Sequence, residues 1–127
     1  MAIEHMMGQD PWTLPASTGI AAFRFVTMSG GNAALATSGT ASVIGVTTIG
    51  TTGSTSDSSV GIYPLGSVAK VTAPASTVAK GDKVSCSTAG QVAALGAGDF
   101  EVGIVVAGSS GGAGRVLSVL LTNAGTT

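Results

Sequence analysis

Charged residues are scarce in this chain, and their scarcity limits the functions open to it. Only 9% of the 127 residues are Asp, Glu, Lys or Arg, and the formal net charge is −1. Soluble surfaces commonly carry about 25–35% charged residues, so this surface must consist largely of Ser, Thr, Gly and Ala. Such a surface fits either a protein that its hydroxyl groups keep in solution or a protein that packs within an assembly. The five basic residues are scattered along the chain and form no basic stripe, which argues against nucleic-acid binding.

Residues that perform chemistry are almost as rare. The chain has one histidine, His5, and one cysteine, Cys86, too few for a Ser-His-Asp triad or a four-ligand zinc site. Cys86 has no intrachain disulfide partner and lies in an alternating segment, so we expect a buried free thiol. Asp99 and Glu101 are assigned to a glycine-rich turn and to the solvent-facing start of a strand. We therefore expect no enzyme activity, no catalytic residue, no metal and no cofactor.

Long hydrophobic runs are also missing. No stretch approaches the roughly 18 apolar residues of a membrane helix, so we expect no membrane partner. The first ten residues include Glu4 and Asp10 and lack the apolar centre of a signal peptide. These features predict a protein that is made in the cytoplasm and stays soluble.

Aromatic residues make up 4% of the chain against 44% hydrophobic residues overall, so the core must consist of Val, Ile, Leu and Ala. Valine is β-branched and favours strands, and 20 glycines supply turns. No window has helical periodicity. Strands are predicted at 23–28, 33–37, 42–47, 60–65, 67–73, 84–87, 91–95, 101–106 and 115–121. The apolar-free segment Gly50–Ser59 is expected to be an exposed loop, and Pro64 to mark a sheet edge or a bulge.

The two halves of the chain resemble each other. Val84 follows Val26 by 58 positions, and Gly103 follows Gly45 by the same 58 positions. In both places a hairpin precedes an apolar-Gly-apolar strand. The sequence therefore predicts an all-β fold, a small barrel or sandwich with two similar halves. The two strand glycines are expected to mark a bend or a close approach of backbones.

The first 19 residues differ from the rest, and we interpret 1–19 as an extended N-terminal arm before a β-domain at 20–127. Pro11 and Pro15 favour extended backbone in the residues before them. The arm also carries apolar residues that a solvated tail would not need. These candidate partner-binding residues are Ile3, Met6, Met7, Trp12 and Leu14.

Several short motifs follow one another between residues 20 and 121. They are Ile44-Gly45-Val46, Val60 to Gly66, Ala79 to Val84, Gly90 to Val92, Val102 to Val105 and Arg115 to Leu121. This order resembles the capsid cement, or decoration, proteins of tailed bacteriophages. Residues 1–19 and the loop 47–59 depart from the short pattern of that family.

The resemblance implies a structural role on the outer surface of a phage head, where the protein would bind the major capsid protein and stabilise the shell. By analogy with the head-decoration protein of phage lambda, it also implies a homo-oligomer, with a trimer expected. In such proteins an N-terminal arm can order on the shell and add a strand to a capsid element, and Trp12 would be the anchor.

A different class of function remains open beside this one. The chain would then be a head-surface or fibre-type binding module that attaches weakly to cell-surface glycans. Glycan sites use exposed aromatic rings, and outside Trp12 the candidates are Phe23, Phe25, Tyr63 and Phe100.

Overall fold

The computed structural model describes residues 12–16, 19–48, 59–73, 78–108 and 115–126. This part of the chain contains strands and turns but no helix, and so no helix long and apolar enough to cross a membrane. The strands are β1 (Trp12–Pro15), β2 (Phe25–Ser29), β3 (Asn32–Leu35), β4 (Gly45–Thr47), β5 (Ser59–Pro64), β6 (Val68–Thr72), β7 (Lys83–Cys86), β8 (Val92–Ala94), β9 (Phe100–Ala107) and β10 (Val116–Thr126). The all-β prediction is confirmed.

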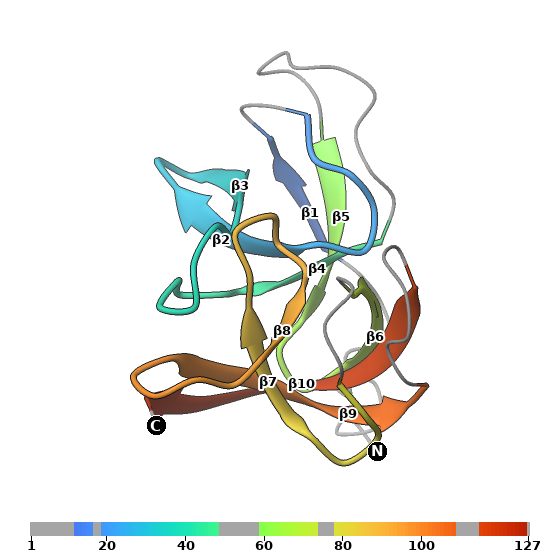
Figure 1. The fold of residues 1–127 in the computed structure, drawn as a ribbon. Coiled ribbons are helices and arrows are strands. Elements are labelled where there is room, and N and C mark those ends of the chain that lie inside the picture. Colours follow the sequence, from blue (N-terminus) through green and yellow to red (C-terminus); the bar gives the residue numbers. More distant parts are fainter. Residues whose placement is uncertain (1–11, 17–18, 49–58, 74–77, 109–114, 127) are drawn as a thin grey trace, which may run out of the picture.

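The strands form two five-stranded sheets, one from each half of the chain (Figure 1). The first sheet has the order β1-β5-β4-β2-β3, and the second has the order β6-β10-β9-β7-β8. Adding five to each strand number of the first sheet reproduces the second, and all the neighbouring strands pair antiparallel. The predicted similarity of the two halves is therefore confirmed at the level of topology.

The repeat extends to the pairing of individual residues. Val26 pairs with Gly45, and Val84 pairs with Gly103 in the second sheet. For β1 and β5 the offset is 57 positions instead of 58, and every residue pair between β1 and β5 has its counterpart between β6 and β10. The halves therefore share one hydrogen-bonding register as well as one strand order.

The two strand glycines stand at close approaches of backbone. A Cβ atom on Gly45 would collide with the carbonyl oxygen of Tyr63 and would lie 2.5 Å from Ile62 Cγ2. A Cβ atom on Gly103 would collide with Val119 Cγ1 and would lie 2.8 Å from the carbonyl oxygen of Leu120. The predicted close approach is confirmed at both equivalent positions, and it explains why neither strand carries a side chain there.

The first half has an apolar interior of its own, and the equivalent residues of the second half belong to a core that the two halves share. The inner residues of the first half are Ala16, Ile20, Val26, Ala33, Val60 and Ile62, and their counterparts, 57 to 59 positions later, are Ala73, Val78, Val84, Val92, Leu117 and Val119. In the first half a parallel bridge between Ala16 and Ala33 brings the two edge strands together. The first half is thus a small barrel-like unit that is nearly closed on itself.

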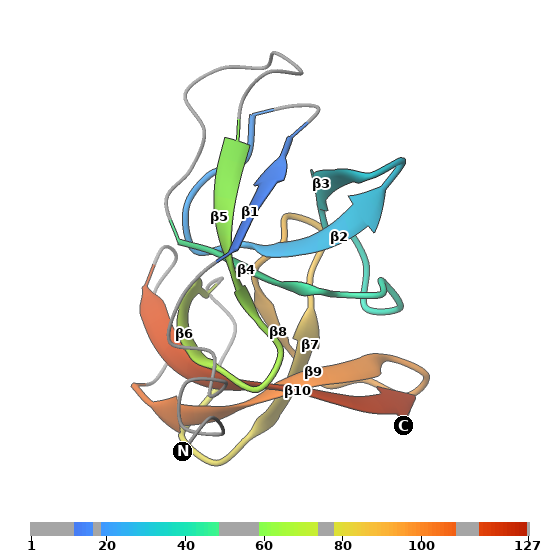
Figure 2. The same ribbon diagram turned by 180° about the vertical axis from the view of Figure 1, so that it is seen from behind.

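The segment just before β2 joins the two halves. The Phe23 carbonyl accepts a hydrogen bond from Thr72 N at 2.9 Å, and Phe25 N donates to the Gly90 carbonyl at 2.8 Å. Both views show β2 and β4 beside the β7–β8 hairpin (Figures 1 and 2). Phe23 has a φ of 62°, a left-handed conformation that is costly for a non-glycine residue. Phe25 is fully buried in a core that continues into the second half, so the described chain packs as one unit.

The structure differs from the predicted arm at 1–19. Trp12–Pro15 is a strand that pairs with β5, and Ala16 and Ile20 are buried in the first half. The strand signal was weak because the strand is only four residues long and ends in a proline. The β-domain therefore begins by residue 12, and residues 1–11 lie outside the described part of the chain.

Smaller differences concern strand limits. The first predicted strand begins at Phe25 instead of Phe23, and the last one runs on to Thr126. Pro64 is the final residue of β5 and pairs with Gly45, beyond the stretch of β5 that pairs with β1. The predicted exposed loop Gly50–Ser59 falls outside the described residues except for Ser59, which is exposed.

Candidate interaction surface

One face of the second sheet combines apolar and lysine side chains and is partly open to solvent. The registers place Val68, Leu120, Ile104 and Lys83 opposite one another in a row across β6, β10, β9 and β7. Directly paired residues point to the same side of a sheet, and the alternate residues of these strands, such as Val119 and Val105, are buried in the core. The row therefore lies on the outer face.

Two further rows extend this face. Lys70 pairs with Ser118, and Thr72 pairs with Val116. Val68 is 57% exposed and Val116 is 42% exposed, two of the three large hydrophobic side chains that are exposed in the described chain. The surface called the outer face below consists of Val68, Lys70, Lys83, Ile104, Val116, Ser118 and Leu120.

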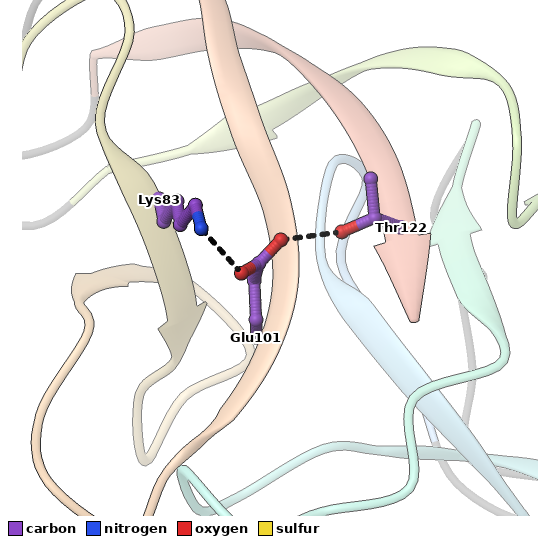
Figure 3. A network of polar contacts seen from close by, with 3 residues as sticks. All are labelled: Lys83, Glu101 and Thr122. Atoms are coloured by element: carbon purple, nitrogen blue, oxygen red, sulfur yellow. Dashed lines mark hydrogen bonds and ion pairs between the residues drawn. The ribbon is translucent and has the colours of Figure 1, made fainter. Parts of the chain in front are cut away.

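A small polar network lies beside the outer face (Figure 3). Lys83 Nζ is 3.6 Å from Glu101 Oε1, and Thr122 Oγ1 donates a hydrogen bond to Glu101 Oε2 at 3.2 Å. The Lys83 side chain is 62% exposed whereas that of Glu101 is only 9% exposed. The Lys83 side chain is therefore accessible to solvent, whereas the Glu101 carboxylate is largely shielded from it. Within the described chain Lys70, also exposed, makes no ion pair.

Glu101 corrects the prediction of a solvent-facing residue. It is 7% exposed although it stands near the start of β9. The pairing of β9 with β10 shifts register between Leu121 and Gly125, so simple alternation does not hold there. The shift accompanies the contact that Thr122 makes with the Glu101 carboxylate.

Asp99 shapes a turn, as predicted. Its Oδ2 accepts hydrogen bonds from Gly96 N at 3.0 Å and from Ser85 Oγ at 3.2 Å. These contacts tie the turn before β9 to β7. Asp99 and Glu101 therefore have separate structural partners. No group of three or more His, Cys, Asp or Glu side chains in the described residues is placed to hold a metal ion.

Cys86 is a buried free thiol, as predicted. Burial raises its pKa from 9.0 to about 12, although backbone hydrogen bonds from Gly90 and Ser38 partly oppose the rise. The thiolate is the nucleophilic form of cysteine, so this side chain, which is protonated at neutral pH, is a poor nucleophile there.

The predicted partner-binding residues fall into two groups. Ile3, Met6 and Met7 lie outside the described residues, so their role stays a prediction. Trp12 and Leu14 belong to β1, and Leu14 packs half-buried against the interior of the first half. The outer face was not predicted, because alternation in 67–73 and 115–121 shows that one side of each strand is buried without showing which strands are neighbours.

Comparison with known proteins establishes the fold. No protein-family model and no curated protein sequence matches the chain. Among solved structures, the head fiber gp8.5 N base in bacteriophage phi29 matches with a TM-score of 0.68 and 18% sequence identity. The match covers 92% of this chain and 97% of that chain, so the likeness includes both halves.

Proposed function

We propose that this chain is a structural protein of a phage head, which decorates the outer surface of the capsid and stabilises the shell. The observation that carries the proposal is the fold likeness to a phage head fiber base, which extends over nearly the whole of both chains. Fold alone does not determine function, but the composition agrees with this role. A chain with 9% charged residues and a single histidine is poorly equipped for catalysis and well suited to packing in an assembly.

The partner in this proposal is the major capsid protein, and the chain acts there as a homo-oligomer, with a trimer expected. Residues 1–11 are the arm that would contact the shell, because Ile3, Met6 and Met7 give it apolar groups to bury. Deleting residues 1–11 is the suitable test of this part. A longer deletion would remove β1, which pairs with β5.

The second candidate is a fibre-type module that binds cell-surface glycans, and the description of the phi29 neighbour as a head fiber protein favours keeping it. Glycan sites stack sugars on exposed aromatic rings. Among the described residues, however, Phe25 is buried and Phe23, Tyr63 and Phe100 are each only partly exposed. The described surface therefore supports decoration more than glycan binding.

The test is co-sedimentation of the purified protein with expanded shells of the phage that encodes it. Decoration predicts saturable binding and a higher temperature of shell disruption when the protein is bound. A control uses unexpanded shells and an unrelated β-domain of similar size. No binding to expanded shells, together with a specific signal on a glycan array, would contradict decoration and favour the second candidate.

A further inference from the structure

Within the described residues, the internal repeat shows that one face of the duplicated unit is more deeply buried in the first half than in the second. In the first sheet, Phe25, Val46 and Tyr63 lie opposite one another in a row. Phe25 and Val46 are fully buried, and Tyr63 packs against the core that the two halves share. The second half uses this face of the first half as a packing surface.

The same row in the second sheet is more exposed, because Lys83 is exposed and Ile104 and Leu120 are half-buried. Lys83 and Ile104 follow Phe25 and Val46 by 58 positions, and Leu120 follows Tyr63 by 57. The row continues to Val68, whose side chain is 57% exposed. Within the described residues, a row that is largely buried in one copy of the unit is thus partly exposed in the other copy.

We propose that this outer face of the second sheet is the surface by which the protein docks on another protein, and that the docking partner presents carboxylates around an apolar centre. This inference deepens the proposed function, on which it rests, by naming the docking surface and the chemistry of the shell site. It adds a contact on the β-domain to the contact proposed for residues 1–11.

The chemistry of the partner follows from the charges on the face. Val68, Val116 and Leu120 form its apolar part, and Lys70 and Lys83 are its exposed charges. The nearby carboxylate, Glu101, is buried and already held by Lys83 and Thr122. The Lys83–Glu101 pair is close to neutral, so the uncompensated charge of the face is that of Lys70, and the face is positive although the chain as a whole has a formal net charge of −1.

The charges on the outer face also indicate which kind of partner could bind it. A second copy that met this face with the same face, as in a two-fold contact, would bring lysines against lysines. The contacts of a trimer join two different surfaces, so self-association through this face is kept as an outcome of the test below. Nucleic acid is a poor fit as well, since two lysines beside valine and leucine offer few phosphate contacts. An acidic protein surface with an apolar centre satisfies both features of the face.

The test uses two substitutions at exposed positions of β6, Val68→Asp and Lys70→Glu. Matched controls are Met28→Asp, which changes the exposed methionine of β2, and Lys80→Glu, which changes an exposed turn lysine. Each face variant should weaken binding to expanded shells by roughly tenfold or more, whereas the controls should bind like the unchanged protein. Thermal unfolding of all four variants verifies that they remain folded.

The salt dependence of shell binding is a second measurement that tests the inference. Exposed lysine–carboxylate contacts are screened by salt, so raising NaCl from about 50 to about 500 mM should weaken shell binding, and Lys70→Glu should reduce this dependence. Face variants that bind as well as the controls would overturn the inference while leaving decoration intact. Loss of binding in the controls as well would overturn it too.

A shell-free measurement keeps the inference separate from the proposed function. A peptide of alternating Leu and Glu residues is titrated into the labelled protein, and amide chemical shifts are followed by NMR. The inference expects shift changes centred on Val68, Lys70 and Leu120, even if the protein does not bind shells. Changes elsewhere, no changes, or salt-independent self-association that Val68→Asp abolishes would overturn it.

Discussion

Alanine at Gly45 is expected to destabilise the protein strongly, because β4 and β5 approach each other too closely for a side chain. A methyl group there would lie 2.5 Å from Ile62 Cγ2 and would collide with the carbonyl oxygen of Tyr63. Ordinary contacts begin near 3.4 Å, so β5 would have to withdraw by about 0.9 Å (3.4 − 2.5) even to accommodate Ile62. Because Tyr63 contributes backbone, no change of rotamer relieves the collision.

The size of the effect follows from the cost of overpacking, which is about 1–3 kcal/mol in well-packed cores. Gly45→Ala is expected near the upper end, about 3 kcal/mol, which corresponds to a fall in Tm of roughly 10 °C for a domain of this size. Gly103→Ala is expected to cost less, about 2 kcal/mol, because its nearest contact is a side-chain atom of Val119.

The assay is denaturant unfolding of both variants, with Gly98→Ala as a control for the loss of glycine. Gly98 has a φ of +84° and no neighbour within 4 Å, so only backbone strain of about 1 kcal/mol is expected there. Combining Gly103→Ala with Val119→Ala should cost less than the sum of the two single changes, by at least about 0.5 kcal/mol. A Gly45→Ala change below about 0.5 kcal/mol, or strict additivity at Gly103, would refute the reasoning.

Four further outcomes are expected. Phe25→Ala should lower the free energy of unfolding by about 3–5 kcal/mol, measured by calorimetry, because it empties a fully buried site between the halves. Cys86 should resist thiol reagents at pH 8 until the protein unfolds. Since its folded pKa of about 12 exceeds the ordinary 9.0, its contribution to stability is complete below pH 9 and declines from pH 9 to 12, a decline that Cys86→Ala should remove. Asp99→Ala and Glu101→Ala should each lower Tm yet leave shell binding by the folded protein nearly unchanged. If a variant that is still folded lost shell binding, the replaced carboxylate would have a direct role in that binding. A tag inserted at Ser56 should still permit decoration, and a folded but non-binding tagged protein would place that loop at the interface.

Much of the fold was predictable because strand signals are local. Alternation of Val with small polar residues and frequent turn glycines identified nine of the ten strands in the described part of the chain, and the shared 58-residue spacing of Val26–Val84 and Gly45–Gly103 revealed the two halves. Burial of Cys86 and the turn at Asp99 were predictable for the same reason, since each depends on a few neighbouring residues. The strand β1 was not predicted, because a strand of four residues that ends in a proline has too little periodicity to be recognised from the sequence.

The sequence by itself therefore determined the all-β class, the duplication, the close backbone contacts at two glycines and the poverty of catalytic groups. Only the tertiary structure decided which strands are neighbours and which side of each sheet is covered. Alternation shows that a strand has a buried side, but Phe25 and Lys83 occupy equivalent positions and one is buried while the other faces solvent. That difference arises because the first half packs its face against the second, a contact between residues far apart in the chain. Strand pairing within the second sheet, which also joins residues far apart in the chain, brings Lys70 and Lys83 onto one outer face.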